Sequence, residues 1–171
     1  MKRLCVFVIG TESSGSKLIA RILAHALGIE PYGNWNGSGW AISQRSPHRL
    51  CHRSQPYGSE GRFSDIRQWN HDNRDFTIRY VICTRDVTIS ERSRRARWPG
   101  RRGTFAEQTE RARSLIRDVM RTCDYTIWSY ETFMFIGADY LRTLYCSLGI
   151  ESDFVAIDTV DANPKHVRRA A

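Results

Sequence analysis

Small and polar side chains and one lysine gather in a single short loop near the amino terminus. Gly10 and Gly15 are separated by four residues, and the segment from Thr11 to Lys17 reads TESSGSK. Glycines let the backbone come close to a ligand, while hydroxyls and successive backbone N–H groups bind the oxygens of an anion. These residue types in this order predict a cradle for a phosphate group. An ordinary turn that enters a helix would not need them.

The residues on either side of this loop predict the elements that hold it. Cys5 to Ile9 is a short apolar run typical of a buried parallel strand, and apolar residues then recur at helical spacing from Leu18 to Leu27. A strand, a loop and a helix in this order present a helix amino terminus to an anion. In the P-loop that binds ATP, a lysine directly follows the second glycine and a Ser or Thr comes next. Here Ser16 follows the glycine and Lys17 comes one place late, so the loop suits a phosphate better than ATP with magnesium.

A second group of anion-binding residues lies about seventy residues downstream. Phe76 to Thr84 predicts another buried strand, which ends at Arg85-Asp86 and is followed by helical sequence as far as Arg97. An arginine at a strand end can bind a phosphate with its planar fork. Ser93 comes eight residues after Arg85, about two turns along the predicted helix, and we expect it to bind the same anion.

The two groups together resemble the nucleotide-binding motifs of the sulfotransferases, which use 3′-phosphoadenosine 5′-phosphosulfate (PAPS). In that family a hydroxyl directly follows the glycine of the phosphosulfate loop, and no magnesium is needed. Arg85-Asp86 with Ser93 resembles the family's R-D-P-x5-S motif, with Val87 in place of the proline. The resemblance implies that the 5′-phosphosulfate is held by Thr11, Ser13, Ser14, Gly15, Ser16, Lys17 and Leu18, and the 3′-phosphate by Arg85 and Ser93.

The chain departs from the family pattern in two places. The lysine that cytosolic members carry two residues before the glycine is Ser13 here, so Lys17 or another residue has to supply positive charge to the bridging oxygen. The family's R-x-G-x-x-G segment, a second ligand of the 3′-phosphate, is absent. Arg94, Arg95 or the pair Arg101-Arg102 could substitute for it.

Sulfuryl transfer needs a general base that takes a proton from the acceptor. The resemblance implies that this base, a His or a Glu, lies between the two nucleotide motifs. The candidates in this part of the chain are His48, His52, His71 and Glu60. We favour His52, because it stands near the end of a short predicted strand (residues 49–54) beside a turn, although a hydrogen-bonded structural histidine explains it equally well. Catalytic roles are thus expected for His52 and Lys17.

Length and alternation of elements predict the fold class. The 171 residues, of which 41% are hydrophobic, suit one domain that spans 1–171, with residues 28–75 as an irregular insertion on the acceptor side. A long amphipathic helix is expected over 104–123, a strand over 124–129, and one further helix from Tyr130 to Leu148. Strands that alternate with helices predict a three-layer α/β/α fold around a parallel sheet. The resemblance implies P-loop-like sulfotransferase topology.

Cysteines and charge indicate the compartment and the partners. Five scattered cysteines show no metal-ligand or redox spacing, which favours reduced thiols and a cytoplasmic chain, and no apolar run is long enough to span a membrane. The net charge of +8, much of it between Arg85 and Arg102, indicates an anionic partner.

Three alternatives to an active sulfotransferase stay open. One is a small-molecule or nucleoside kinase that uses ATP through the same loop, and another is a non-catalytic anion or nucleic-acid binder that uses the arginine cluster. The third is a sulfotransferase-like protein that binds the nucleotide without turnover. Nucleic acid is the less expected partner, because it leaves both phosphate motifs unexplained. A small-molecule or glycan acceptor is expected, and its identity is not readable from the sequence.

Overall fold

The computed structural model of the chain describes residues 3–58, 60–97, 105–156 and 159–167. A five-stranded sheet in the order β2-β3-β1-β4-β5 forms its centre. The strands are β1 (Leu4–Thr11), β2 (Gly39–Ile42), β3 (Arg49–Gln55), β4 (Thr77–Thr84) and β5 (Tyr125–Ser129). β3, β1, β4 and β5 pair in parallel, and only β2, at one margin of the sheet, is antiparallel to its neighbour. The predicted parallel sheet is therefore confirmed except at this margin.

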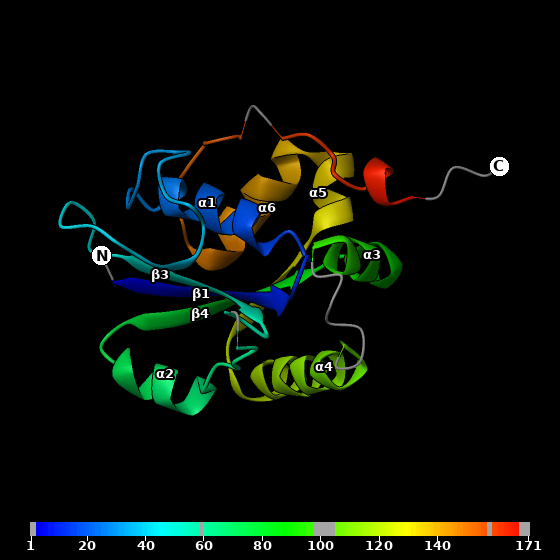
Figure 1. Cartoon of the computed structure of the whole chain (residues 1–171). Helices are drawn as coiled ribbons and strands as arrows, with labels where there is room; N and C mark the ends of the chain where they lie inside the picture. The colour runs from blue at the N-terminus through cyan, green and yellow to red at the C-terminus, as the bar shows by residue number, and fades with distance from the viewer. Residues whose placement is uncertain (1–2, 59, 98–104, 157–158, 168–171) are drawn as a thin grey trace.

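Helices cover both faces of the sheet (Figure 1). They are α1 (Ser16–Ala26), α2 (Ile66–Asp72), α3 (Val87–Arg97), α4 (Phe105–Thr122), α5 (Tyr130–Ile136) and α6 (Ala138–Leu148), followed by a short 3-10 helix, η2 (Pro164–His166). Figure 1 shows α1 and α6 on one side of the strands and α2 and α4 on the other. The arrangement is an α/β fold compatible with three α/β/α layers, as the alternation of elements predicted.

Strand β1 lies in the middle of the sheet and divides the core in two. Its side chains alternate between the faces: Val6 and Val8 pack with α1 and α6, whereas Phe7 and Ile9 pack with Tyr80 and with the apolar face of α4. All four are completely buried. A strand buried on both faces has to be apolar throughout, which is why residues 5–9 gave a continuous apolar signal.

Two regions differ from the expected element boundaries. The single helix expected from Tyr130 to Leu148 is two helices, because Gly137 adopts φ 68° and ψ −125°, which is outside the helical range, and separates α5 from α6. Gly149, with φ 69°, ends α6 in the left-handed conformation that is common at helix ends. The segment 28–75 contains β2, β3 and α2, and β3 is a direct neighbour of β1.

The parallel strands place their carboxyl ends at one edge of the sheet. Thr11 of β1 is in register with Gln55 of β3, and Gly10 is in register with Cys83 near the end of β4. The loop after β1 and the residue after β4, Arg85, therefore emerge side by side. In open α/β sheets ligands bind at this edge, where connections leave a central strand in opposite directions.

Candidate functional site

The loop between β1 and α1 has an unusual backbone. Ser13 has a φ of 66° and Gly15 a φ of 80°, so two loop residues adopt the left-handed conformation with Ser14 between them. For a non-glycine residue this conformation costs about 1–3 kcal/mol, and such residues cluster at functional sites. Ser14 N–H donates to the carbonyl oxygen of Thr11 at 3.2 Å, which closes the loop. Alternating conformations of this kind form a concave nest of backbone N–H groups that suits an anion.

Helix α1 begins directly after this loop and contributes its amino terminus. Gly15 is the N-cap residue, no side chain caps the helix, and its first turn contains no acidic residue. The N–H groups of a first helical turn have no partner within the helix, and the helix dipole adds a partial positive charge there. The side chain of Lys17 is exposed at the same end of the helix. The first turn of α1 thus offers N–H donors and the positive charge of Lys17, while the preceding loop also contains one carboxylate, that of Glu12.

The two glycines of the loop serve internal packing. A Cβ atom on Gly10 would lie 2.6 Å from Ser14 Oγ and 2.8 Å from the carbonyl oxygen of Cys83. A Cβ atom on Gly15 would lie 2.6 Å from Cδ2 of Tyr130 and 3.2 Å from Cζ3 of Trp128. These short distances show that both glycines seat the loop closely on the ends of β4 and β5. That the glycines also admit a phosphate to the backbone stays a prediction.

Ser16 and His52, both singled out from the sequence, are hydrogen-bonded to each other. His52 lies in β3, opposite Val8 of β1, and its Nε2 is 2.8 Å from Ser16 Oγ. Its Nδ1 is hydrogen-bonded to the carbonyl oxygen of Gly37. Because a carbonyl can only accept, Nδ1 carries the proton and Nε2 accepts from the Ser16 hydroxyl. His52 is 3% exposed and Ser16 is equally buried, so the pair forms a fixed unit beneath the start of α1.

The charge state of His52 follows from its surroundings. Burial lowers its pKa to about 4; the hydrogen bond to Gly37 opposes this, and the charges of Lys17 and Arg53 lower the pKa further. The imidazole is therefore neutral at pH 7, and its basic nitrogen is already engaged by Ser16. Any proton that His52 takes from a ligand in this arrangement has to pass through the Ser16 hydroxyl.

Arg85 joins the second sequence motif to the loop. Its Nη1 donates to the carbonyl oxygen of Ser13 at 3.0 Å, and its Nε and Nη2 donate to Oδ1 of Asn163 at 2.9 and 2.6 Å. The guanidinium lies over the ring of Tyr130, 4.5 Å from the ring centre. Two residues separated by 72 positions in the sequence, Ser13 and Arg85, are thus in direct contact.

The carboxyl-terminal tail lies against the same edge of the sheet. Besides the contact of Asn163 with Arg85, the carbonyl oxygen of His166 accepts from Nη1 of Arg92 in α3 at 3.0 Å. Ser93 is half-buried on α3, next to Arg92. Within the described part of the chain, the structure assigns no hydrogen bond to the Ser93 side chain. Ser93 thus lies on the helix whose Arg92 contacts the tail, and its role as a ligand of the 3′-phosphate stays a prediction.

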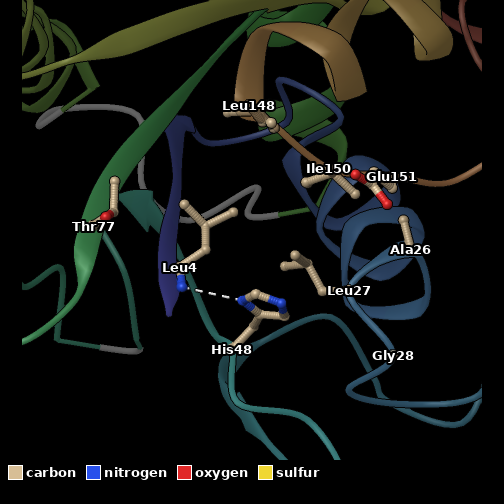
Figure 2. Close-up of a pocket in the computed structure, with 10 residues that line it drawn as sticks. Leu4, Ala26, Leu27, Gly28, His48, Thr77, Leu148, Ile150 and Glu151 are labelled. Atoms are coloured by element: carbon tan, nitrogen blue, oxygen red, sulfur yellow. Dashed lines mark hydrogen bonds between the residues drawn. The ribbon is translucent and has the colours of Figure 1, made fainter. Parts of the chain in front are cut away.

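The other candidates for a general base lie elsewhere. His48 accepts from the N–H of Leu4 at 3.0 Å and lines a cavity of about 450 Å³ at the amino end of β1 (Figure 2). Leu4 and Thr11 stand at opposite ends of β1, roughly 23 Å apart at the usual rise per residue. His71 is exposed at the end of α2, and Glu60 is exposed in an ion pair with Arg62. Among the four candidates, only His52 contacts a residue of the loop.

The arginine-rich stretch divides into buried and exposed members. Arg94 is 5% exposed, its Nη2 donates to Oγ1 of Thr109 at 2.9 Å, and its guanidinium lies over the ring of Phe105. Arg95 and Arg97 are exposed on α3. Arg101 and Arg102, the other candidates for a phosphate ligand, lie outside the described residues. Over residues 85–97, the described part of the stretch, the arginines therefore do not form one continuous exposed surface.

A cavity of about 220 Å³ adjoins the loop on the side of α3 and α4. It is lined by Thr11, Glu12, Ile82, Cys83, Thr84, Arg85, Val87, Ser90, Glu91, Arg94, Thr109, Arg113 and Ile116. The sequence analysis did not single out Glu12 or Ser90, and it considered Arg94 only as a phosphate ligand. Ser90 and Arg94 are four residues apart on the helix predicted after Arg85. This spacing places two side chains on one helix face, and it is the sequence signal that could have identified them together.

Within the described ranges, no group of three His, Cys, Asp or Glu side chains is placed to hold a metal ion. In the same ranges, no helix has the length and apolar character that crossing a membrane requires. Comparison of the chain with protein-family models, with curated proteins and with solved structures finds no significant match. The assignment of function therefore depends on the site itself.

Proposed function

We propose that the chain is a sulfotransferase that moves a sulfuryl group from PAPS to a hydroxyl or amine of a small-molecule or glycan acceptor, without a metal ion. One observation carries the proposal: Arg85 Nη1 lies 3.0 Å from the carbonyl oxygen of Ser13. The two motifs that resemble the family's nucleotide-binding motifs are far apart in sequence. Their contact supports a single site with one phosphate group at each end.

The residues of the site fit the two phosphate ends of PAPS. The nest formed at Ser13 and Gly15, the uncapped amino terminus of α1 and the exposed Lys17 suit the 5′-phosphosulfate. The fork of Arg85 is aimed at an oxygen atom, Oδ1 of Asn163, and a phosphate oxygen could take the same place. Bound in this way, PAPS would supply an activated sulfuryl group.

Lys17, Ser16 and His52 would then have separate roles in the reaction. Lys17 and the N–H groups of the first turn of α1 would stabilise negative charge as it develops on the departing phosphate. Ser16 would accept the proton of the acceptor while passing its own proton to Nε2 of His52, 2.8 Å away. His52 therefore acts through Ser16. The hydrogen bond to the Gly37 carbonyl keeps Nδ1 of His52 protonated and holds the imidazole ring in its orientation.

The site offers less support to the other functions. A kinase would need a lysine directed at the ATP phosphates and a hydroxyl for magnesium, yet Leu18 follows Lys17 and packs partly against the core. A nucleic-acid surface needs a continuous exposed basic face, whereas Arg94 is buried and Arg85 bonds within the protein. All five cysteines are free, which suits a reducing compartment such as the cytoplasm.

Calorimetric titration of the full chain tests the proposal. We expect 3′-phosphoadenosine 5′-phosphate, the product nucleotide, to bind equally well with EDTA and with magnesium, and ATP with magnesium not to bind. ATP binding that depends on magnesium would favour the kinase instead. Binding of neither nucleotide would refute a nucleotide site and would bring the arginine-rich stretch back into consideration.

Substitutions of Arg85 test the observation that carries the proposal. Arg85→Ala removes a bidentate, charge-assisted contact of about 3 kcal/mol, so the dissociation constant should rise about 100-fold. Arg85→Lys keeps the charge without the planar fork and should recover only part of the affinity. Arg79→Ala is the matched control: Arg79 is the same residue type and lies near the start of β4, whereas Arg85 follows the other end of that strand. Unchanged binding in Arg85→Ala would contradict the proposal.

A further inference from the structure

The cavity beside the loop has apolar walls and a small set of polar groups. Ile82 and Cys83 of β4, Val87 of α3 and Ile116 of α4 supply apolar atoms to its lining. Its volume, about 220 Å³, is below the range of about 300–1,000 Å³ that is usual for sites of drug-sized ligands. The cavity therefore suits one ring with small substituents and is too small for a nucleotide or a sugar chain.

Two hydrogen-bond donors in the lining are buried without a partner. Ser90 is 7% exposed and Arg94 is 5% exposed, and within the described residues Ser90 Oγ and Arg94 Nε have no hydrogen-bond partner. They stand four residues apart on α3, on one face of the helix. Leaving a buried donor unpaired costs about 1–3 kcal/mol, and more for a charged group. A ligand that accepts from both would recover this free energy.

The positive charge that bears on a ligand of the cavity is that of Arg94. Of the other two arginines in the lining, Arg113 forms an ion pair with Glu110 at 3.8 Å and Arg85 donates to Ser13 and Asn163. Arg94 is held in place by Thr109 and by the ring of Phe105, so its unpaired Nε–H is fixed rather than free to find water. Burial lowers the pKa of Arg94, while the negative charges of Glu12 and Glu91 act in the opposite direction. A carboxylate placed on Ser90 and Arg94 would add to that stabilisation.

The cavity opens toward the phosphate loop, because Thr11, Glu12 and Arg85 belong to both. The residues that line it include Thr11 and Glu12 at the beginning of the loop, but not Ser16 or His52. By contrast, the lining of the larger cavity in Figure 2 lies at the other end of β1 and contains no arginine. Unlike that cavity, the cavity beside the loop adjoins the residues proposed to bind the nucleotide.

We propose that this cavity is the acceptor site and that it binds a small hydroxylated aromatic carboxylate, with the carboxylate on Ser90 and Arg94 and the hydroxyl directed toward Thr11. The acceptor role rests on the proposed function, whereas the binding of the carboxylate does not. The apolar walls contact the ring, the two unpaired donors select the carboxylate, and the volume excludes larger acceptors.

The test is calorimetric titration of the full chain with 4-hydroxybenzoate, with and without 3′-phosphoadenosine 5′-phosphate. We expect binding in both states, and at least tenfold weaker binding of 4-hydroxybenzyl alcohol, which lacks the carboxylate. Arg94→Met, which keeps the length of the side chain, should lower affinity at least 100-fold. Ser90→Ala, a milder change, should lower it about tenfold and guards against misfolding of the first variant. Arg97→Ala, an exposed arginine of the same helix, should have no effect.

The outcomes separate this inference from the proposed function. If the nucleotide binds but 4-hydroxybenzoate does not, the acceptor site is refuted and the nucleotide site stands. The same conclusion follows if the nucleotide binds and 4-hydroxybenzoate binds equally well to wild type, Ser90→Ala and Arg94→Met. If 4-hydroxybenzoate binds through Ser90 and Arg94 but the nucleotide does not, the proposed function fails and the acceptor role fails with it. Binding of both ligands at once, with the expected effects of the variants, supports the inference.

Discussion

The buried histidine beneath the loop gives the sharpest prediction about stability. His52 is 3% exposed, and its pKa falls from 6.5 to about 4 on folding, mainly because burial disfavours the charged imidazolium. In the unfolded chain the same side chain takes up a proton near pH 6.5. Between these two values the unfolded state binds more protons than the folded state, so the free energy of unfolding falls as the pH is lowered from 6.5 to 4.

The size of the effect follows from the two pKa values. Lowering the pKa of His52 from 6.5 to about 4 corresponds to about 3–4 kcal/mol, since one pKa unit is worth about 1.4 kcal/mol. The loss should be about 1 kcal/mol at pH 5.5 and about 2–3 kcal/mol at pH 4.5, and it should level off at about pH 3. Above about pH 7.5 His52 is neutral in both states and contributes no dependence on pH.

The measurement is urea denaturation of the wild-type chain and of His52→Gln at pH 7.5, 5.5 and 4.5. Carboxylates also titrate in this range, so the informative quantity is the change with pH of the difference in free energy between the two proteins. Wild type should lose the stated amounts relative to His52→Gln. His71→Gln, the same change at an exposed histidine, is the matched control variant. A difference between wild type and His52→Gln that does not change with pH would refute a neutral, buried His52.

Two further predictions concern the loop and the tail. Gly15→Ala should destabilise the fold by about 2–5 kcal/mol in urea denaturation, because its φ is 80° and its Cβ would lie 2.6 Å from the ring of Tyr130. Gly28→Ala is the control, because Gly28 has φ 64° and no atom lies within 4 Å of the added Cβ. It should cost only the backbone contribution, about 1–2 kcal/mol. If the two substitutions lowered the free energy of unfolding equally, the contact of residue 15 with Tyr130 would be absent. Asn163→Ala should tighten binding of 3′-phosphoadenosine 5′-phosphate up to about tenfold in calorimetry, because Asn163 Oδ1 occupies the fork of Arg85. Weaker binding would instead mean that Asn163 holds Arg85 in position.

Strongly patterned segments were predictable from the sequence because their signal is local. The apolar run around Val6 and Val8 marked the central strand, and the helical spacing after Leu18 marked α1. The same holds for β4, β5 and α4, whose observed ends agree with expectation within about one residue. The break between α5 and α6 was missed, because a glycine within an apolar helical pattern is often tolerated, and only the conformation of Gly137 shows that the helix ends there.

The residues of the candidate site were predictable as types but not as partners. The sequence named Ser16, His52 and Arg85 from motif and spacing. It did not indicate that Ser16 would engage the basic nitrogen of His52, or that Arg85 would contact Ser13 and Asn163. Those contacts depend on the register of β3 and β4 against β1, and register is set by side-chain packing between strands that are distant in the sequence.

The sequence by itself thus determined the class of fold, the small-residue loop between a strand and a helix, and the arginine that follows a second strand, because each depends on neighbouring residues and on hydrophobic period. Only the tertiary structure decided which residues meet. It buried His52, placed Asn163 on Arg85, and enclosed Ser90 and Arg94 in a cavity with donors left unpaired. The physical reason is that burial and hydrogen-bond partnership are properties of the packed whole. The sequence gives the type of each side chain, whereas its neighbours in space determine its burial, its hydrogen-bond partners and its protonation state.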